Sequence, residues 1–281
     1  MPASLPTVVV PVFNSVAGLD ACLASLERTL PAGSAVLIAD DASSDPHVEP
    51  LARGWCYRSK LAARYLRRDT QLGLAANLSA AIAETGDADV VWLKPEAVTT
   101  PGWLHQLARA AVESTRSATL ATWSNQSELC SFPRFGESSL PSEFPETIAD
   151  AAVALAGVAG PELPAVSGPC LFLRRVALRQ LGGLDTTSFS GSHALDDFCR
   201  RAAAMGWSNL LCPAVFVVAL PPAAPSLDAS DDLPRLLARW PDYQELVARF
   251  ILSDPLRDLR ERLQTRIDEL ARSGPQRDLF N

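Results

Sequence analysis

Acidic residues follow two apolar runs of the chain at the points where those runs end. Asp40 and Asp41 come directly after residues 35–39, and Glu96 comes shortly after residues 90–93. A carboxylate past the end of a buried strand can accept hydrogen bonds from a ligand, because open α/β sheets bind ligands at the carboxyl ends of their strands. The alternative is a purely structural turn, since Asp and Ser favour turns. These three carboxylates are the first candidates for a binding site.

A second acidic pair, Asp196 and Asp197, stands where a helix over residues 196–205 is predicted to begin. A positioned carboxylate can take a proton from a hydroxyl group as that group attacks a substrate. The alternative is a plain helix amino terminus, where carboxylates stabilise the helix dipole.

Strands and helices alternate in the first half of the chain. Runs rich in β-branched residues predict buried strands, whereas apolar residues spaced three and four apart predict helices. We expect strands at residues 7–13, 35–39, 63–66 and 90–93, and helices after Asn14-Ser15, over residues 75–83 and from Thr100 as cap with Pro101 at the first helical position. This alternation predicts an α/β fold with a mostly parallel sheet covered by helices.

The second half of the chain is less regular. We expect strands at residues 170–173, 210–212 and 215–220, and helices over residues 148–158, 176–181 and 196–205. Gly182-Gly183 should stop the helix before it. Residues 221–232 have the composition of a linker. The sequence therefore predicts one domain over residues 1–220, followed by a linker and a C-terminal helical extension over residues 221–281.

The last predicted helix spans residues 254–272 and carries a single apolar stripe. Its members are Leu256, Leu259, Leu263, Ile267 and Leu270. Such a stripe can pack on its own domain, which is the commoner outcome for a short segment, or it can form a homodimer or another partner contact.

Composition and charge limit the classes of function. A net charge of −7 argues against a general nucleic-acid binder, which needs a basic face. No basic region precedes the first apolar run and no apolar stretch is long enough for a transmembrane segment. The six cysteines are scattered and the three histidines isolated, so we expect reduced thiols in a cytoplasmic protein without a zinc site.

Four segments resemble, in the same order, those of family 2 glycosyltransferases, which have the Rossmann-like GT-A fold. They are residues 8–14 (VVVPVFN), 37–45 (LIADDASSD), 92–103 (WLKPEAVTTPGW) and 168–207. Residues 122–125 and 131–135 resemble a branch of that family acting in bacterial surface-polysaccharide and protein glycosylation. Each motif is weak alone, but their order over about residues 6–218 is specific.

The resemblance implies a nucleotide sugar as ligand, with a UDP- or dTDP-sugar as donor. Asp40 or Asp41 would accept hydrogen bonds from the N–H group of the base and from the ribose hydroxyls. Pro11 and Phe13 would line the nucleotide site, with the Phe13 ring against the base or ribose, where the family often has Tyr. An aromatic at the end of a buried strand can also simply belong to the core.

The resemblance also implies a divalent metal, Mn²⁺ or Mg²⁺, held by two acidic residues against the diphosphate. Here Lys94 replaces the first and only Glu96 remains as a metal ligand. One carboxylate is a poor site for these ions unless the phosphates complete it. The ammonium of Lys94 is an alternative diphosphate ligand, and exposed turn residues are the structural alternative.

The catalytic segment departs from the family too. Its two leading acidic positions are Ala194 and Leu195 here, whereas Asp197 matches the last carboxylate. Asp196 could substitute as the base that deprotonates the acceptor hydroxyl, and His193 is a weaker candidate. The late histidine that follows a strand in many members is absent from residues 215–222. The acceptor region is expected within residues 125–165 and 186–196.

Two functions follow from these departures. The first is an inverting glycosyltransferase that transfers a sugar to a glycan or protein acceptor. The second is a catalytically degenerate GT-A domain that binds or scaffolds in a glycosylation complex. A sugar nucleotidyltransferase is a weaker third, since no glycine-rich phosphate loop follows the first strand.

Overall fold

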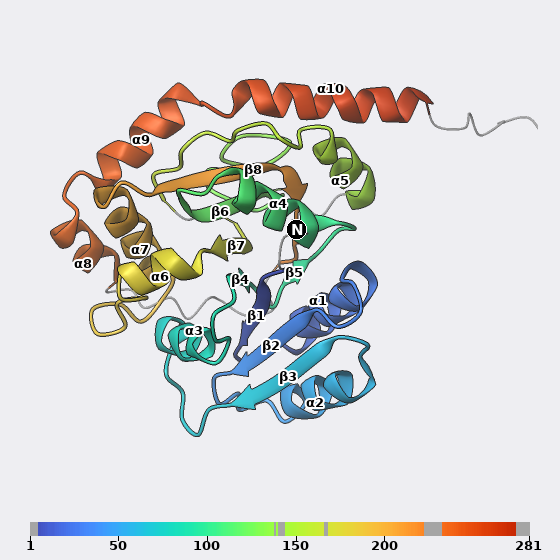
Figure 1. Ribbon diagram of the computed structural model, residues 1–281, viewed down its shortest axis with the longest axis vertical. Helices are drawn as coiled ribbons and strands as arrows, with labels where there is room; N and C mark the ends of the chain where they lie inside the picture. The colour runs from blue at the N-terminus through green and yellow to red at the C-terminus, as the bar shows by residue number, and fades with distance from the viewer. Residues whose placement is uncertain (1–4, 138, 140–143, 166–167, 222–231, 274–281) are drawn as a thin grey trace, which may run out of the picture.

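The computed structural model describes residues 5–137, 139, 144–165, 168–221 and 232–273. Its centre is a seven-stranded sheet in the order β3-β2-β1-β4-β7-β6-β8, and a second sheet pairs β5 with β9 (Figure 1). In the large sheet β7 runs antiparallel to β4 and β6, and every other neighbouring pair is parallel. The predicted α/β architecture, a mostly parallel sheet covered by helices, is confirmed.

The first half of the chain follows the predicted alternation. It contains β1 (Thr7–Val12), α1 (Val16–Thr29), β2 (Ala35–Asp40), α2 (Val48–Arg58), β3 (Ala62–Arg67), α3 (Leu74–Ala83) and β4 (Val90–Leu93). All four expected strands are present. Helix α2 was not predicted, because its buried face is short and consists of Val48, Ala52 and Trp55.

The order of the strands creates a topological switch at β1. The chain passes from β1 to β2 on one side of β1 and later returns to place β4 on the other side. Connections that leave in opposite directions open a crevice at the carboxyl ends of the two strands, where open α/β sheets bind ligands. The segments after β1 and β4 therefore border the expected binding edge.

Strand residues alternate between two apolar layers, as the two-residue period of a β-strand requires. Val8, Val10 and Val12 belong to the layer that includes residues of α1 and α2. Val9 and Trp92 belong to the other layer, with residues of α3. Burial of the central strands on both faces explains their continuous apolar runs.

The second half adds the remaining strands of the sheet. It contains β5 (Ala97–Val98), α4 (Trp103–Glu113), β6 (Ser117–Trp123), α5 (Pro145–Val153), β7 (Cys170–Leu173), α6 (Arg175–Gln180), α7 (His193–Ala204), β8 (Ser208–Phe216) and β9 (Val218–Ala219). Strand β6 was not predicted. The expected strands at 210–212 and 215–220 are corrected to one long strand, β8, and the short β9.

Three predicted helix starts are also corrected. Helix α4 begins after Gly102, whose φ of 76° interrupts the expected start at Pro101, and the Thr100 hydroxyl donates to a strand carbonyl instead. Helix α7 begins three residues before Asp196. Ser15 precedes α1 but makes no side-chain cap bond to it. Its hydroxyl has another partner, described below.

The C-terminal extension packs on the domain through three helices. They are α8 (Asp232–Arg239), α9 (Tyr243–Ser253) and α10 (Arg257–Ser273). Asp254, the expected cap of the last helix, instead ends α9 with a φ of 38°. Residues 222–231 of the predicted linker lie outside the described residues.

The apolar stripe of α10 faces its own chain. Leu256, Leu259 and Leu263 are buried in the layer of α3 and α7, and α10 runs along α5 (Figure 1). Packing on its own domain, the commoner of the two predicted outcomes, is therefore observed. The homodimer contact and the division at residue 220 remain predictions.

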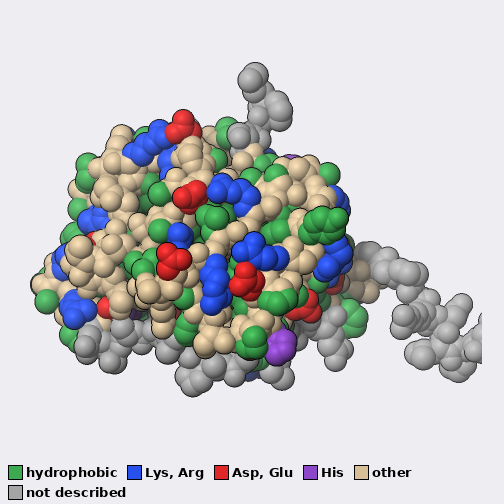
Figure 2. Space-filling view, turned by 90° about the horizontal axis from the view of Figure 1, so that it is seen from below, with side chains coloured by type: hydrophobic (Ala, Val, Ile, Leu, Met, Phe, Trp, Pro, Cys, Tyr) green, Lys and Arg blue, Asp and Glu red, His purple; other side chains and the backbone are tan. Residues whose placement is uncertain are grey.

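The surface mixes charges of both signs. On the face below α2 and β3, basic side chains lie beside acidic ones (Figure 2). Ion pairs of these elements include Arg53 with Glu49 in α2, and Arg64 of β3 with Glu84. Within the described part of the chain, no helix is both long and apolar enough to cross a bilayer.

Candidate functional site

Asp40 is completely buried at the end of β2 and accepts from three donors. Its Oδ1 accepts from the Ser43 N–H at 2.8 Å, and its Oδ2 accepts from the Tyr65 hydroxyl at 2.5 Å and from Arg67 at 2.7 Å. Burial and then the hydrogen bond to Asp40 raise the pKa of Tyr65, which keeps its hydroxyl a donor. Asp40 thus holds β2, β3 and the following turn together. Its contact with a nucleotide stays a prediction.

Asp41 fixes the start of α3. Its two oxygens accept from the backbone N–H groups of Leu72 at 2.8 Å and Gly73 at 2.9 Å. Gly73 has a φ of 85°, a conformation that glycine adopts without strain, and it stands directly before α3. The structure therefore gives both predicted nucleotide-binding carboxylates structural partners.

Asn14 joins the segments after β1 and β2. Its backbone N–H donates to the Ser43 hydroxyl at 3.0 Å, and its side-chain oxygen accepts from the Asp45 N–H at 2.9 Å. The preceding Phe13 is half-buried at this edge, whereas Pro11 is buried within β1. The aromatic ring predicted to meet the nucleotide is thus held on a fixed backbone.

Glu96 is directed toward the amino terminus of α1. Its Oε1 accepts from the Ser15 hydroxyl at 2.5 Å. A Cβ on Gly18 of α1 would lie 3.0 Å from the Glu96 Cγ, so this glycine leaves the room that the glutamate fills. Burial and then the nearby Glu96 charge raise the pKa of the Cys22 thiol one turn further along α1. The hydrogen bond joins the segment after β4 to the segment after β1.

Lys94 takes a different direction from Glu96. Its ammonium lies 5.8 Å from the centre of the Trp92 ring, within the range of a cation–π contact. Trp92 belongs to the layer of α3, on the opposite face of the sheet from α1. The Lys94 side chain is exposed and makes no ion pair with any described residue.

The residues at this edge do not fit a protein-held divalent metal. Glu96 is the sole carboxylate in the segment after β4 and already binds Ser15, while the neighbouring functional group is the ammonium of Lys94. Among the residues that the structure describes, no group of three or more His, Cys, Asp or Glu side chains could hold a metal ion. Mn²⁺ and Mg²⁺ require several oxygen ligands. Metal binding by Glu96 stays a prediction that this donor set does not favour.

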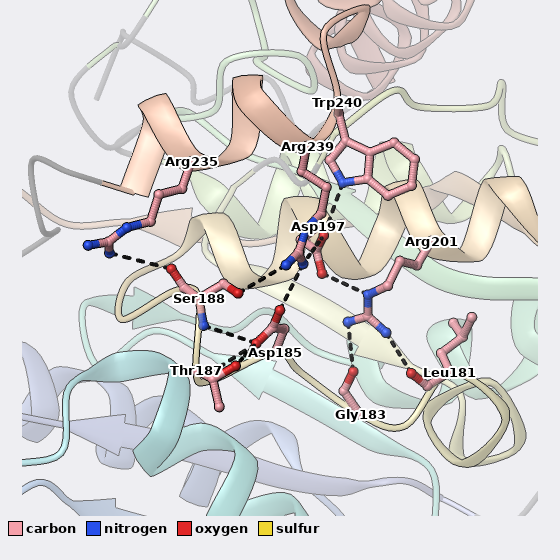
Figure 3. A network of polar contacts seen from close by, with 10 residues as sticks. All are labelled: Leu181, Gly183, Asp185, Thr187, Ser188, Asp197, Arg201, Arg235, Arg239 and Trp240. Carbon is pink, nitrogen blue, oxygen red and sulfur yellow. Dashed lines mark hydrogen bonds and ion pairs between the residues drawn. The ribbon is translucent and has the colours of Figure 1, made fainter.

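Asp197 is the centre of a buried polar network (Figure 3). Its Oδ2 accepts from Arg201, one turn along α7, at 2.7 Å. Its Oδ1 accepts at 3.0 Å from both Arg239 and the indole N–H of Trp240, which come from the end of α8. The structure thus gives Asp197 three protein donors, and its predicted catalytic role stays a prediction that these contacts do not favour.

The same network fixes the turn before α7. The Asp185 Oδ1 accepts from Thr187 and Ser188, and its Oδ2 accepts from Arg239 at 2.8 Å (Figure 3). Burial raises the pKa of Asp185, but the hydrogen bonds from Thr187, Arg239 and Ser188 outweigh it and bring the pKa well below its usual range. Arg201 also donates to two carbonyls of the preceding turn.

Asp196 has partners of its own. The His193 Nδ1 lies 2.9 Å from its Oδ2, and the Tyr243 hydroxyl of α9 also bonds to it. Burial and then the Asp196 charge raise the pKa of Tyr243. The structure thus brings together the two residues predicted as possible bases, Asp196 and His193, under a helix of the C-terminal extension.

The two positions predicted to match the family's leading acidic residues are part of the core. Ala194 and Leu195 are each 1% exposed and pack in the layer of α3 and α7. In the segment expected to carry the late histidine, the Asn125 side chain accepts from the Ala219 N–H at 2.7 Å and donates to the Ala219 carbonyl at 3.0 Å. These positions offer no proton acceptor to a substrate.

A separate cavity of about 690 Å³ lies between α5 and α10. Its walls include Phe132, Phe144, Phe216 and Ile267, together with Asn125. None of the residues predicted for catalysis, nucleotide binding or metal binding lines it, but Asn125, Phe132 and Phe144 belong to the expected acceptor region of residues 125–165.

Several residues at the site were not predicted. Tyr65 and Arg67 donate to Asp40 from the neighbouring strand, and Ser15 donates to Glu96 across the switch point. Trp240 and Tyr243 reach α7 from the extension. All these partners come from distant parts of the sequence, so local spacing gave no signal for them.

The chain matches a family described as glycosyl transferase family 2 over residues 7–182. No curated protein matches it. Among solved structures, the mannosyltransferase PcManGT from Pyrobaculum calidifontis, in complex with GDP-Man and Mn²⁺, is 17% identical with a TM-score of 0.60. That match covers 98% of this chain and 78% of the mannosyltransferase.

Two further structures share the fold. GalNAc-T7 with UDP, GalNAc and Mn²⁺ is 13% identical with a TM-score of 0.62, covering 94% of this chain and 55% of that one. S. aureus TarS 1-349 in complex with UDP-GlcNAc is 15% identical with a TM-score of 0.55. That match covers 94% of this chain and 83% of the TarS chain. At these identities the likeness establishes the fold, and the predicted GT-A architecture is confirmed.

Proposed function

The chain belongs to glycosyl transferase family 2, and from that membership we propose that it binds a nucleotide sugar at the carboxyl ends of β1, β2 and β4. The bound sugar would then be transferred to a glycan or protein acceptor. The predicted context is bacterial surface-polysaccharide or protein glycosylation.

One observation carries the proposal. Asn14 ties the segment after β1 to the segment after β2, and Ser15 ties it to Glu96 after β4. Three strand ends at a topological switch are thereby held in one fixed edge, which is where this class of sheet binds ligands. Phe13 and Lys94 stand on that edge with an aromatic ring and a cation.

The donor we propose is a UDP- or dTDP-sugar. Two of the similar structures were solved with UDP or UDP-GlcNAc, and a third with GDP-Man. In transfer with inversion, a base removes the proton of the acceptor hydroxyl as its oxygen attacks the anomeric carbon, and the nucleoside diphosphate leaves. The Asp196–His193 pair would supply that base.

A second candidate function is binding without turnover, as a module of a glycosylation complex. The burial of Ala194 and Leu195 and the engagement of Asp197 by three donors favour it. Under this alternative the nucleotide-binding edge persists while the acceptor-activating centre has become part of the core.

Two measurements separate these candidates. Calorimetric titration with UDP and dTDP, each with and without Mn²⁺, tests nucleotide binding, and absence of binding in every condition would refute the proposed site. Turnover of UDP- and dTDP-sugars by the pure protein tests catalysis. Transfer that is lost in Asp196→Ala supports the transferase, whereas binding without turnover supports the module.

A further inference from the structure

Lys94 is unusual within this chain. The protein has 25 basic residues besides histidine, yet only Lys60 and Lys94 are lysines. One of these two stands at the switch edge, over the Trp92 ring. Since it has no anionic partner among the described residues, its charge is available to a ligand.

The other charged group of the segment, Glu96, is engaged by a residue of the edge. Glu96 shares a short hydrogen bond of 2.5 Å with Ser15 and fills the space above Gly18. A carboxylate held this way keeps its charge close to the amino terminus of α1, where helix dipoles favour negative charge. The ammonium and the carboxylate thus face opposite layers of the sheet.

Charge balance relates this arrangement to a metal site. The summed charge of two carboxylates and the divalent cation that they hold is zero. The summed charge of one lysine and one carboxylate is also zero. Lysine is a compact cation that binds phosphate as a point charge. We propose that the Lys94 ammonium takes the place of a divalent cation, so that this edge binds a nucleoside diphosphate without metal. This inference rests on the proposed nucleotide site.

Direct observation of the lysines tests the contact. Reductive methylation with ¹³C-formaldehyde labels only the two lysines and the terminal amine, and it preserves their charge. We expect UDP, added in EDTA, to shift the Lys94 methyl signal while the Lys60 signal stays in place. Loss of one signal in Lys94→Met identifies it. UDP binding that leaves the Lys94 signal unmoved would overturn the inference.

Calorimetry measures the size of the effect. In EDTA, Lys94→Met should weaken UDP binding about tenfold or more, as expected for loss of a charge-assisted contact. Methionine keeps an unbranched apolar side chain over Trp92 but removes the charge. Lys60→Met is the matched control, because Lys60 is exposed and lies outside the switch edge, and its affinity should be that of the unmodified protein.

The outcomes distinguish this inference from the function beneath it. If the protein binds UDP only with Mn²⁺, the nucleotide site stands and the role of Lys94 is refuted. If Lys94→Met binds UDP as tightly as the unmodified protein does, the role of Lys94 is likewise refuted and the nucleotide site stands. If UDP and dTDP bind in no condition, the nucleotide site itself is refuted.

Discussion

The switch edge and the start of α7 both carry predicted acidic site residues, but these residues have different surroundings. At the switch edge, hydrogen bonds from Asn14 and Ser15 fix the backbone, and an unpaired cation remains exposed. At α7, Asp196 and Asp197 are both covered by residues of the C-terminal extension. The edge retains a surface for a ligand, whereas α7 has become a support for the extension.

Under the proposed function, this difference would separate nucleotide binding from catalysis. At the edge, one lysine beside one carboxylate carries the same net charge as two carboxylates together with a bound divalent cation. At α7, the positions predicted to match two acidic residues of the family are Ala194 and Leu195, which pack in the apolar core. The first departure keeps a cation at the edge, while the second leaves no carboxylate at those two positions.

The strongest way to break the comparison is to remove Asp197. Asp197→Ala leaves Arg201, Arg239 and Trp240 without their shared acceptor and should lower the free energy of unfolding by about 3 kcal/mol. Urea unfolding measures it. Asp242→Ala, which removes an exposed partner of Arg200, is the control and should cost less than about 1 kcal/mol. An equal loss of unfolding free energy in the two variants would contradict a structural role for Asp197.

Restoring a carboxylate at the edge should sharpen the comparison. Lys94→Asp recreates an acidic pair with Glu96, so UDP binding should become dependent on Mn²⁺, with affinity rising about tenfold when the ion is added. Calorimetry in Mn²⁺ and in EDTA gives this ratio, and Lys60→Asp serves as control. A ratio of one in Lys94→Asp would mean that Glu96 is held too firmly by Ser15 to bind a metal.

Two glycines test the fit of Glu96 against α1. Alanine in place of a helical glycine normally stabilises by about 0.5–1 kcal/mol, and Gly54→Ala in α2 should do so because it meets only the flexible Arg58 side chain. Gly18→Ala should instead destabilise by about 1 kcal/mol, since its Cβ would lie 2.7 Å from the Ser15 Oγ. Thermal unfolding of both variants decides the point. Stabilisation by Gly18→Ala would show that the Ser15–Glu96 contact is loose.

The smallest expected effect concerns acid. The pKa of Asp185 is lowered in the folded state, so its contribution to stability is present above its unfolded pKa and is lost as pH falls toward the folded one. Asp185→Asn should therefore cost roughly 1 kcal/mol at pH 7, and the difference from the unmodified protein should shrink below about pH 4. Urea midpoints between pH 3 and 7 measure it. If the stability difference between Asp185→Asn and the unmodified protein does not change with pH, the Asp185 charge does not contribute to stability.

The parallel strands were predictable because burial on both faces makes each one a continuous apolar run. β1, β2, β3 and β4 lie where the sequence placed them, within two residues. Strand β6 and helix α2 were missed, since β6 carries Ser and Thr among its apolar residues and α2 has a short buried face. Helices α8 and α9 were not predicted individually, and Asp254, the expected cap of the last helix, ends α9 in a left-handed conformation.

The candidate site was predictable in position but less so in detail. Strand ends identified Asp40, Asp41, Lys94 and Glu96, which do border the switch edge. Their hydrogen-bond partners were not predictable, because Tyr65 and the Gly73 N–H are brought to them only by the tertiary fold. Whether these residues bind a nucleotide remains a prediction.

Two of the three donors to Asp197 are synthesised well after it. Arg239 lies 42 residues beyond Asp197, and Ser190 is equally far from its acceptor Asp232. At synthesis rates of about 5–20 residues per second, α7 is made roughly 2–8 s before Arg239. During that interval Arg201, on the same helix, is the one donor of the three that Asp197 can already reach. The β1–β4 half can pair its own strands meanwhile, so the polar network at α7 can be completed only after those strands are available.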